Sequence, residues 1–153
     1  MLILSPMTIQ KSITKEEVRE LPLGKYTGEI IYVDSEDRLA AAFSELKSAP
    51  WIGIDTETKP NFKKGSFNPV ALLQMATEQS VFLIPLKANG MPPMISEIMS
   101  STAHTKVGIS TAQDMKELKR DYGTESKNVV DLNKMATRRG YKNIGARNLA
   151  GMI

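Results

Sequence analysis

Residues 51–60 read WIGIDTETKP, an apolar stretch that runs directly into two acidic residues, Asp55 and Glu57. The apolar start predicts a strand over 51–58. Because side chains alternate along a strand, both carboxylates point to one face, roughly 6.6–6.8 Å apart. Two ionised carboxylates at that separation repel each other unless a cation lies between them. The stretch therefore indicates a cation site, although an exposed strand end explains the same two residues.

The segments that follow this strand predict an α/β fold. Apolar runs on either side of the polar pair Glu78-Gln79 indicate a hairpin, so three antiparallel strands lie in succession. Strands and helices then alternate, which is typical of a mixed sheet with helices packed on it. The predicted strands are 29–35, 51–58, 70–77, 80–86, 106–109 and 128–132, and the longer predicted helices are 35–49, 111–122 and 132–139.

A third acid, Asp114, lies in the first turn of the helix that follows the 106–109 strand. It shares a helix face with Leu118, which is expected to pack inward, so Asp114 is expected at the margin of the core. A second interpretation is purely structural. With Thr111 or Ser110 as the N-cap, an acid at this position satisfies the helix start and its dipole.

Length and composition exclude several classes of protein. The 153 residues suffice for one domain with a hydrophobic core, and no run approaches the roughly 18 apolar residues of a membrane helix. The absence of cysteine excludes disulfides and thiol catalysis and is compatible with a reducing compartment, so we expect a cytoplasmic protein. The net charge of +3 is compatible with nucleic-acid binding and equally with an ordinary solvated surface. The single histidine, His104, is expected at the surface.

Three segments together resemble the 3′–5′ exonucleases of the DEDD superfamily, which have an RNase H-like fold. They are IGIDTET followed by ALLQMAT, then KVGISTAQDMKEL, and finally NVVDLNKMA. Among subfamilies, RNase D and the exonuclease domain of the Werner-syndrome helicase are the most similar. The resemblance implies an N-terminal extension over 1–27 and an exonuclease domain over 28–153. It also implies a mixed sheet, with an antiparallel meander of three strands and further parallel strands, flanked by helices.

The resemblance further implies that Asp55, Glu57 and Asp114 are catalytic residues and bind two Mg²⁺ or Mn²⁺ ions. Such ions support hydrolysis of the 3′-terminal phosphodiester of DNA or RNA. The family's fourth acid comes from a late tyrosine- or histidine-plus-aspartate motif, and no acid follows Asp131 in this chain. Asp131 itself is interpreted as structural, as a cap for the 132–139 helix.

We therefore expect a domain that is incomplete at its C-terminus and lacks the last helices of the fold. Apolar surface left near residue 153 would then favour self-association or a partner chain. The alternative function is that of a catalytically incomplete nuclease-like domain that binds nucleic acid or a protein partner.

Several residues near the acids are candidates for substrate binding. Lys63 and Lys64 suit phosphates, and Phe67 suits a base of a single-stranded end. A solvated loop with an anchoring aromatic explains these three residues equally well. Thr58 and Gln74 are expected to line the substrate cleft.

Overall fold

The computed structural model describes residues 10–60, 67–86 and 90–152. These residues form two compact units. The larger unit comprises residues 26–131, and the smaller one combines the segment before residue 26 with the segment from residue 132 onward. The predicted domain boundary between residues 27 and 28 stays a prediction.

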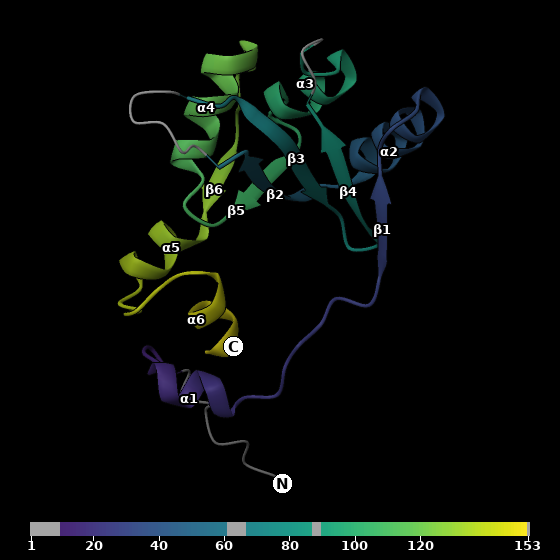
Figure 1. Ribbon diagram of the computed structural model, residues 1–153. Helices are drawn as coiled ribbons and strands as arrows, with labels where there is room; N and C mark the ends of the chain where they lie inside the picture. The colour runs from purple at the N-terminus through teal and green to yellow at the C-terminus, as the bar shows by residue number, and fades with distance from the viewer. Residues whose placement is uncertain (1–9, 61–66, 87–89, 153) are drawn as a thin grey trace, which may run out of the picture. The chain divides into compact units, whose positions relative to one another are not determined.

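The larger unit is built on a six-stranded mixed sheet (Figure 1). Strand β3 pairs antiparallel with both β2 and β4. The other three pairs, β1 with β4, β2 with β5 and β5 with β6, are parallel. The predicted meander and mixed sheet are thus confirmed. The strand order is β1-β4-β3-β2-β5-β6, with bounds β1 Glu29–Tyr32, β2 Trp51–Thr58, β3 Val70–Ala76, β4 Ser80–Pro85, β5 Thr105–Gly108 and β6 Val129–Asp131.

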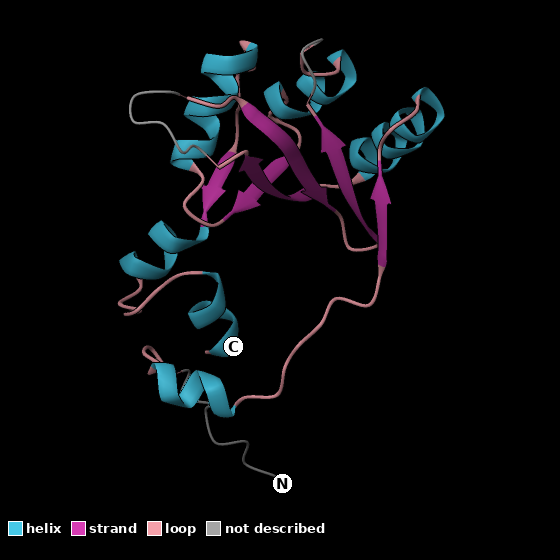
Figure 2. Ribbon diagram, viewed as in Figure 1, coloured by secondary structure: helices cyan, strands magenta, loops and turns pink. Residues whose placement is uncertain are grey.

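Three helices pack on one face of this sheet, as Figure 2 shows. They are α2 (Glu36–Ser48), α3 (Pro93–Ser100) and α4 (Ala112–Tyr122). Ser35 is the N-cap of α2, because its hydroxyl accepts a hydrogen bond from the backbone N–H of Arg38 at 3.3 Å. The core lies between the helices and the sheet, where residues such as Leu46, Ile52 and Leu118 are completely buried. Among the described residues, no helix of this unit covers the opposite face.

Strand β2 extends beyond one of its two neighbours. Its pairing with β5 covers only Trp51–Gly53, whereas its pairing with β3 runs from Gly53 to Thr58. The second half of β2 therefore projects past the end of β5. Asp55 and Glu57 both lie on this projecting half.

A buried lysine fixes the junction between α3 and β5. Lys106 is completely buried, and its ammonium donates hydrogen bonds to the backbone carbonyls of Ile98, Ser101 and His104 at 3.3, 2.6 and 2.9 Å. Ile98 and Ser101 lie at the C-terminal end of α3, where the helix dipole favours a positive charge. Burial lowers the pKa of Lys106 to about 8. This lysine is therefore a structural residue that ends α3.

The smaller unit contains α1 (Lys15–Glu20), α5 (Leu132–Arg138) and α6 (Ala146–Gly151). Helix α1 begins with a capping box, in which Thr14 and Glu17 bond reciprocally. Ile13, Val18 and Met152 form its small core. In the part of the chain that the structure describes, no helix is long and apolar enough to cross a membrane.

Candidate active site

The two acids of β2 lie side by side on the uncovered face of the sheet. Asp55 and Glu57 are exposed, whereas Ile52 and Ile54 are buried on the other face, as strand alternation predicts. The Asp55 carboxylate accepts a hydrogen bond from the backbone N–H of Thr56 at 3.0 Å. Within the described ranges, neither acid forms an ion pair. Both carboxylates are thus accessible to a ligand.

Two of the predicted cleft residues, Thr58 and Gln74, lie on the paired strands β2 and β3. Gln74 of β3 is directly opposite Asp55 in the register, so its half-buried side chain lies next to that carboxylate on the same face. Thr58 is exposed and pairs with Val70, after a register shift between Glu57 and Thr58. Gln74 can therefore contact a molecule bound at Asp55.

The third acid reaches β2 from the helix-covered face. The Thr56 hydroxyl donates a hydrogen bond of 2.7 Å to the Asp114 carboxylate. Thr111, one of the two predicted alternatives, is the N-cap residue of α4, but its side chain makes no capping hydrogen bond. Asp114 therefore does more than satisfy the start of α4: it joins that helix to the strand between Asp55 and Glu57.

The electrostatics around Asp114 favour a bound cation. Burial raises the pKa of Asp114, and the carboxylates of Asp55, Glu117 and Asp131 raise it further, whereas the Thr56 hydrogen bond opposes the shift. A cation near these groups would relieve their mutual repulsion and favour the ionised form. This end of β2 is therefore a region of negative charge.

The carboxylates fit a hard divalent cation by their chemistry. Among the residues that the structure describes, however, no three side chains of this kind gather closely enough to hold one ion. Asp55 and Glu57 point to the uncovered face, whereas Asp114 approaches from the helix side, and this difference separates the three acids. Mg²⁺ is usually held by one or two carboxylates together with water and substrate phosphates. Asp55 and Glu57 can supply these carboxylates. Joint ligation by all three acids stays a prediction.

Comparison with known proteins identifies the family of this fold and site. A family model described as 3′–5′ exonuclease matches residues 30–152. The chain belongs to the 3′–5′ exonuclease family. Its fold agrees with this assignment: the crystal structure of the EXD2 exonuclease domain superposes with a TM-score of 0.64 at 26% sequence identity, covering 74% of this chain and 61% of that one.

Two curated relatives belong to the same group of exonucleases. An Arabidopsis thaliana 3′–5′ exonuclease is 24% identical over 139 residues, which cover 83% of this chain and 48% of that protein. The mouse exonuclease 3′-5′ domain-containing protein 2 is 30% identical over 102 residues, which cover 63% of this chain and 15% of that protein. The chain thus spans about half or less of the length of these relatives.

In this member of the 3′–5′ exonuclease family, Asp131 has a position that the sequence analysis does not predict. Its carboxylate accepts a hydrogen bond from the backbone N–H of Ser110 at 3.2 Å, and its charge contributes to the raised pKa of Asp114. A topological signal predicts this proximity, because the C-terminal ends of the parallel neighbours β5 and β6 meet at one edge of the sheet. Asp131 therefore belongs to the surroundings of Asp114, besides preceding α5.

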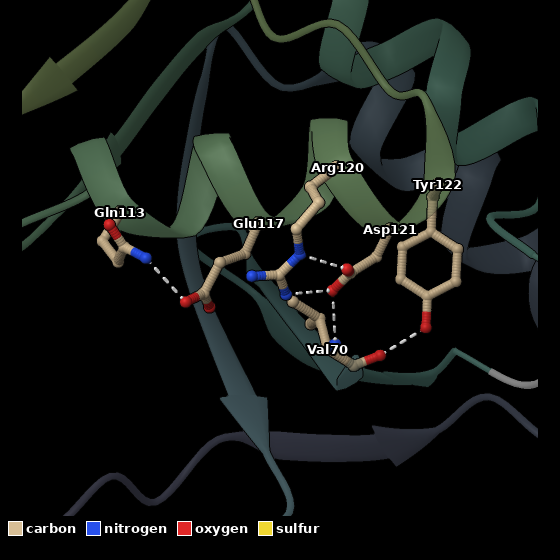
Figure 3. Close-up of polar contacts among 6 residues, drawn as sticks. All are labelled: Val70, Gln113, Glu117, Arg120, Asp121 and Tyr122. Carbon is tan, nitrogen blue, oxygen red and sulfur yellow. Dashed lines mark hydrogen bonds and ion pairs between the residues drawn. The ribbon is translucent and has the colours of Figure 1, made fainter. Parts of the chain in front are cut away.

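The C-terminal end of α4 is hydrogen-bonded to the first residue of β3 (Figure 3). Asp121 accepts a hydrogen bond from the backbone N–H of Val70 at 2.9 Å, and the Tyr122 hydroxyl donates one to the Val70 carbonyl. Arg120 donates to both oxygens of Asp121, at 2.6 and 2.9 Å. Because Val70 pairs with Thr58, this contact fixes the strand pair next to Glu57.

The predicted substrate loop is described only at its end. Lys63 and Lys64 lie outside the described residues. Phe67 is 82% exposed, and the Arg120 guanidinium lies 5.8 Å from the centre of its ring. His104 lies at the other end of β2, where its ring nitrogen contacts the Ala49 carbonyl at 3.0 Å.

Proposed function

We propose that the chain is a metal-dependent 3′–5′ exonuclease domain that hydrolyses the 3′-terminal phosphodiester of DNA or RNA. One observation carries the proposal. Asp55 and Glu57 lie exposed on one face of the projecting half of β2, and Thr56 between them is bonded to Asp114. The match to the 3′–5′ exonuclease family supports the proposal that a cation and a terminal phosphate bind here.

The residues of the site have separate tasks in this proposal. Asp55 and Glu57 would hold the divalent ion, and Asp114 would complete its surroundings. Bound divalent ions stabilise the attacking and leaving oxygens of an in-line displacement and lower the pKa of the attacking water. Thr56 orients the Asp114 carboxylate, and Gln74, beside Asp55, can donate a hydrogen bond to the terminal nucleotide.

Similar solved structures support the choice of ion and ligand. Crystals of the EXD2 exonuclease domain, 27% identical, were soaked in Mg and GMP, and others, 25% identical, were soaked in Mn and GMP. These soaks concern EXD2. For the present chain they support Mg²⁺ or Mn²⁺ as the metal and nucleic acid as the partner.

The exonuclease proposal is tested by replacing Asp55. A single-stranded oligonucleotide with a 5′ label reveals 3′-terminal cleavage as a descending ladder in the presence of Mn²⁺. We expect Asp55→Asn to lower the cleavage rate by at least about 100-fold, because second-shell changes at metal sites alone cost 10- to 100-fold. Glu78→Gln, an exposed acid in the β3–β4 turn, is the matched control and should retain the wild-type rate. Equal rates for wild type and Asp55→Asn would contradict the proposal.

A second candidate function is favoured by the spread of the three acids. Since no three described acids gather around one point, the chain can instead be a nuclease-like domain that binds nucleic acid or a protein partner without turnover. Calorimetric titration with Mn²⁺ separates the two functions. Two sites favour the enzyme, and a single weak site favours the binding domain. Self-association through apolar surface near the C-terminus and a cytoplasmic location stay predictions.

A further inference from the structure

We propose that Phe67 is a stacking platform for a nucleobase and that Arg120 is the positioning residue that holds its ring. The proposal rests on the proposed function and names the part of the substrate that this surface binds. Phe67 is 82% exposed, and the Arg120 guanidinium lies 5.8 Å from its ring centre. One side of the phenyl ring thus faces a cation, and most of the remainder faces solvent.

The exposure of Phe67 argues against a role as a loop anchor. An anchoring aromatic gains its stabilisation by burying ring surface, and this ring buries less than a fifth of its area. Base stacking requires the opposite arrangement, an aromatic face open to solvent, and it tolerates any base because every base has a π-face. The ligand class is therefore a nucleobase of single-stranded nucleic acid.

Arg120 is itself held in place, so it can hold the ring. Its guanidinium donates two hydrogen bonds to Asp121, whose side chain is only 9% exposed. Asp121 in turn accepts from the backbone of Val70, three residues after Phe67 (Figure 3). Because Asp121 balances the charge of Arg120, we assign Arg120 the placement of the ring rather than the capture of a phosphate.

Helix α4 and the β2–β3 strand pair connect the platform to the acids of the candidate active site. Arg120 and Asp114 belong to the same helix, six residues apart, which corresponds to a rise of about 9 Å. On the strand side, Val70 pairs with Thr58, the residue after Glu57. In the proposed arrangement, a single strand whose 3′ end reaches Asp55 stacks one of its last bases on Phe67.

The test measures binding in EDTA, so that no cleavage occurs. Fluorescence anisotropy compares two 5′-labelled probes, an oligothymidylate and the same strand with three abasic nucleotides at its 3′ end. We expect Phe67→Leu to weaken binding of the first probe by roughly 5- to 100-fold, since stacking contributes about that much per base. Phe67→Trp retains a ring and should bind at least as well as wild type. Neither change should alter binding of the abasic probe.

A double-mutant cycle tests the role of Arg120. If Arg120 acts through the ring, Arg120→Ala weakens binding of the first probe, but Phe67→Leu/Arg120→Ala binds no more weakly than Phe67→Leu alone. Lys119→Ala removes a neighbouring charge, paired with Glu125 at 2.7 Å, and is the matched control. Circular dichroism confirms that each variant is folded. Additive losses would overturn the positioning role.

The outcomes separate this proposal from the proposed function. Equal binding of oligothymidylate by wild type and Phe67→Leu overturns the platform, as does an equal loss with the abasic probe. If the platform is overturned in this way but the wild-type chain cleaves in Mn²⁺ and Asp55→Asn does not, the exonuclease proposal stands. A wild-type chain that neither binds the oligonucleotide nor cleaves it overturns both.

Discussion

The Thr56 hydroxyl donates a hydrogen bond of 2.7 Å to the Asp114 carboxylate, across 58 positions of sequence. Thr56 stands between the two exposed acids of β2, and Asp114 lies in the first turn of α4. Through this contact the helix and the strand hold their acidic groups at one end of the sheet. Its partners are only partly buried, so the bond is strengthened by a charged acceptor without being isolated from solvent.

Replacing Thr56 should weaken both the fold and the site. Thr56→Val keeps the shape of the side chain but removes the donor, and we expect a loss of about 1–2 kcal/mol in the free energy of unfolding, measured in urea. Cleavage in Mn²⁺ should fall with it, because Asp114 loses its orientation. Thr56→Ser retains the hydroxyl and is the control. If the valine and serine variants are equally stable and active, the hydrogen bond has no such role.

Gly108 is expected to tolerate no side chain. A Cβ at this position would lie 2.5 Å from Cγ2 of Thr111 and 2.6 Å from the backbone oxygen of Ile54, the residue before Asp55. We expect Gly108→Ala to cost about 1–3 kcal/mol of unfolding free energy, as overpacking does. Gly24→Ala is the control, because nothing lies within 4 Å of its added Cβ and it should be nearly neutral. A melting temperature unchanged by Gly108→Ala would contradict this prediction.

The contribution of the Asp121–Val70 hydrogen bond to the free energy of unfolding should decrease in acid. The hydrogen bonds from Arg120 lower the pKa of Asp121, and the Val70 N–H lowers it further, while desolvation opposes both. An acid with a lowered folded-state pKa contributes stability above its ordinary pKa, and that contribution is lost as the pH falls through the folded-state value. We therefore expect the unfolding free energy of wild type, relative to Asp121→Asn, to decrease below about pH 4.

The control for this acid response is Tyr122→Phe. It removes the second contact with Val70, yet the lost hydroxyl does not titrate in acid. Its difference from wild type should therefore stay constant from pH 7 to pH 3 in urea titrations. A constant difference for Asp121→Asn over the same range would show that Asp121 is not ionically coupled to Arg120.

Lys106 should produce a pH dependence of the same sign at alkaline pH. Its folded-state pKa of about 8 lies below the ordinary value of 10.5. Between these values the unfolded chain binds more protons than the folded one, so the contribution of this group to stability rises with pH. The unfolding free energy of wild type relative to Lys106→Met is therefore expected to increase from pH 8 to pH 10. A flat difference would show that Lys106 keeps its ordinary pKa.

The elements predicted from the sequence are those fixed by neighbouring residues. Alternation along 51–58 correctly placed Asp55 and Glu57 on one face, and the polar pair at 78–79 correctly indicated the hairpin, because both signals are local. The N-caps Thr14 and Ser35 are local in the same sense, because serine and threonine are residue types that favour helix starts.

The contacts that shape the site depend on distant elements. The bonds from Thr56 to Asp114 and from Val70 to Asp121 join residues 58 and 51 positions apart, and they exist only once α4 is seated on the sheet. No periodicity in the sequence carries that information. Thr111 is the N-cap residue of α4, but its backbone is already helical and its side chain makes no capping bond, a state that residue types alone do not reveal.

Because β5 pairs with only the first half of β2, mutations in the two halves of this strand are expected to have different effects. Its first residues, Trp51–Gly53, are held by β5, and the next, Asp55–Thr58, project past that neighbour while β3 supports them from the other side. Changes in the first half are therefore expected to act on folding yield, and changes at the exposed acids of the second half on reactivity. For protein engineering, the ion preference that we propose for this strand is thus open to redesign at Asp55 and Glu57 with little effect on expression of the domain.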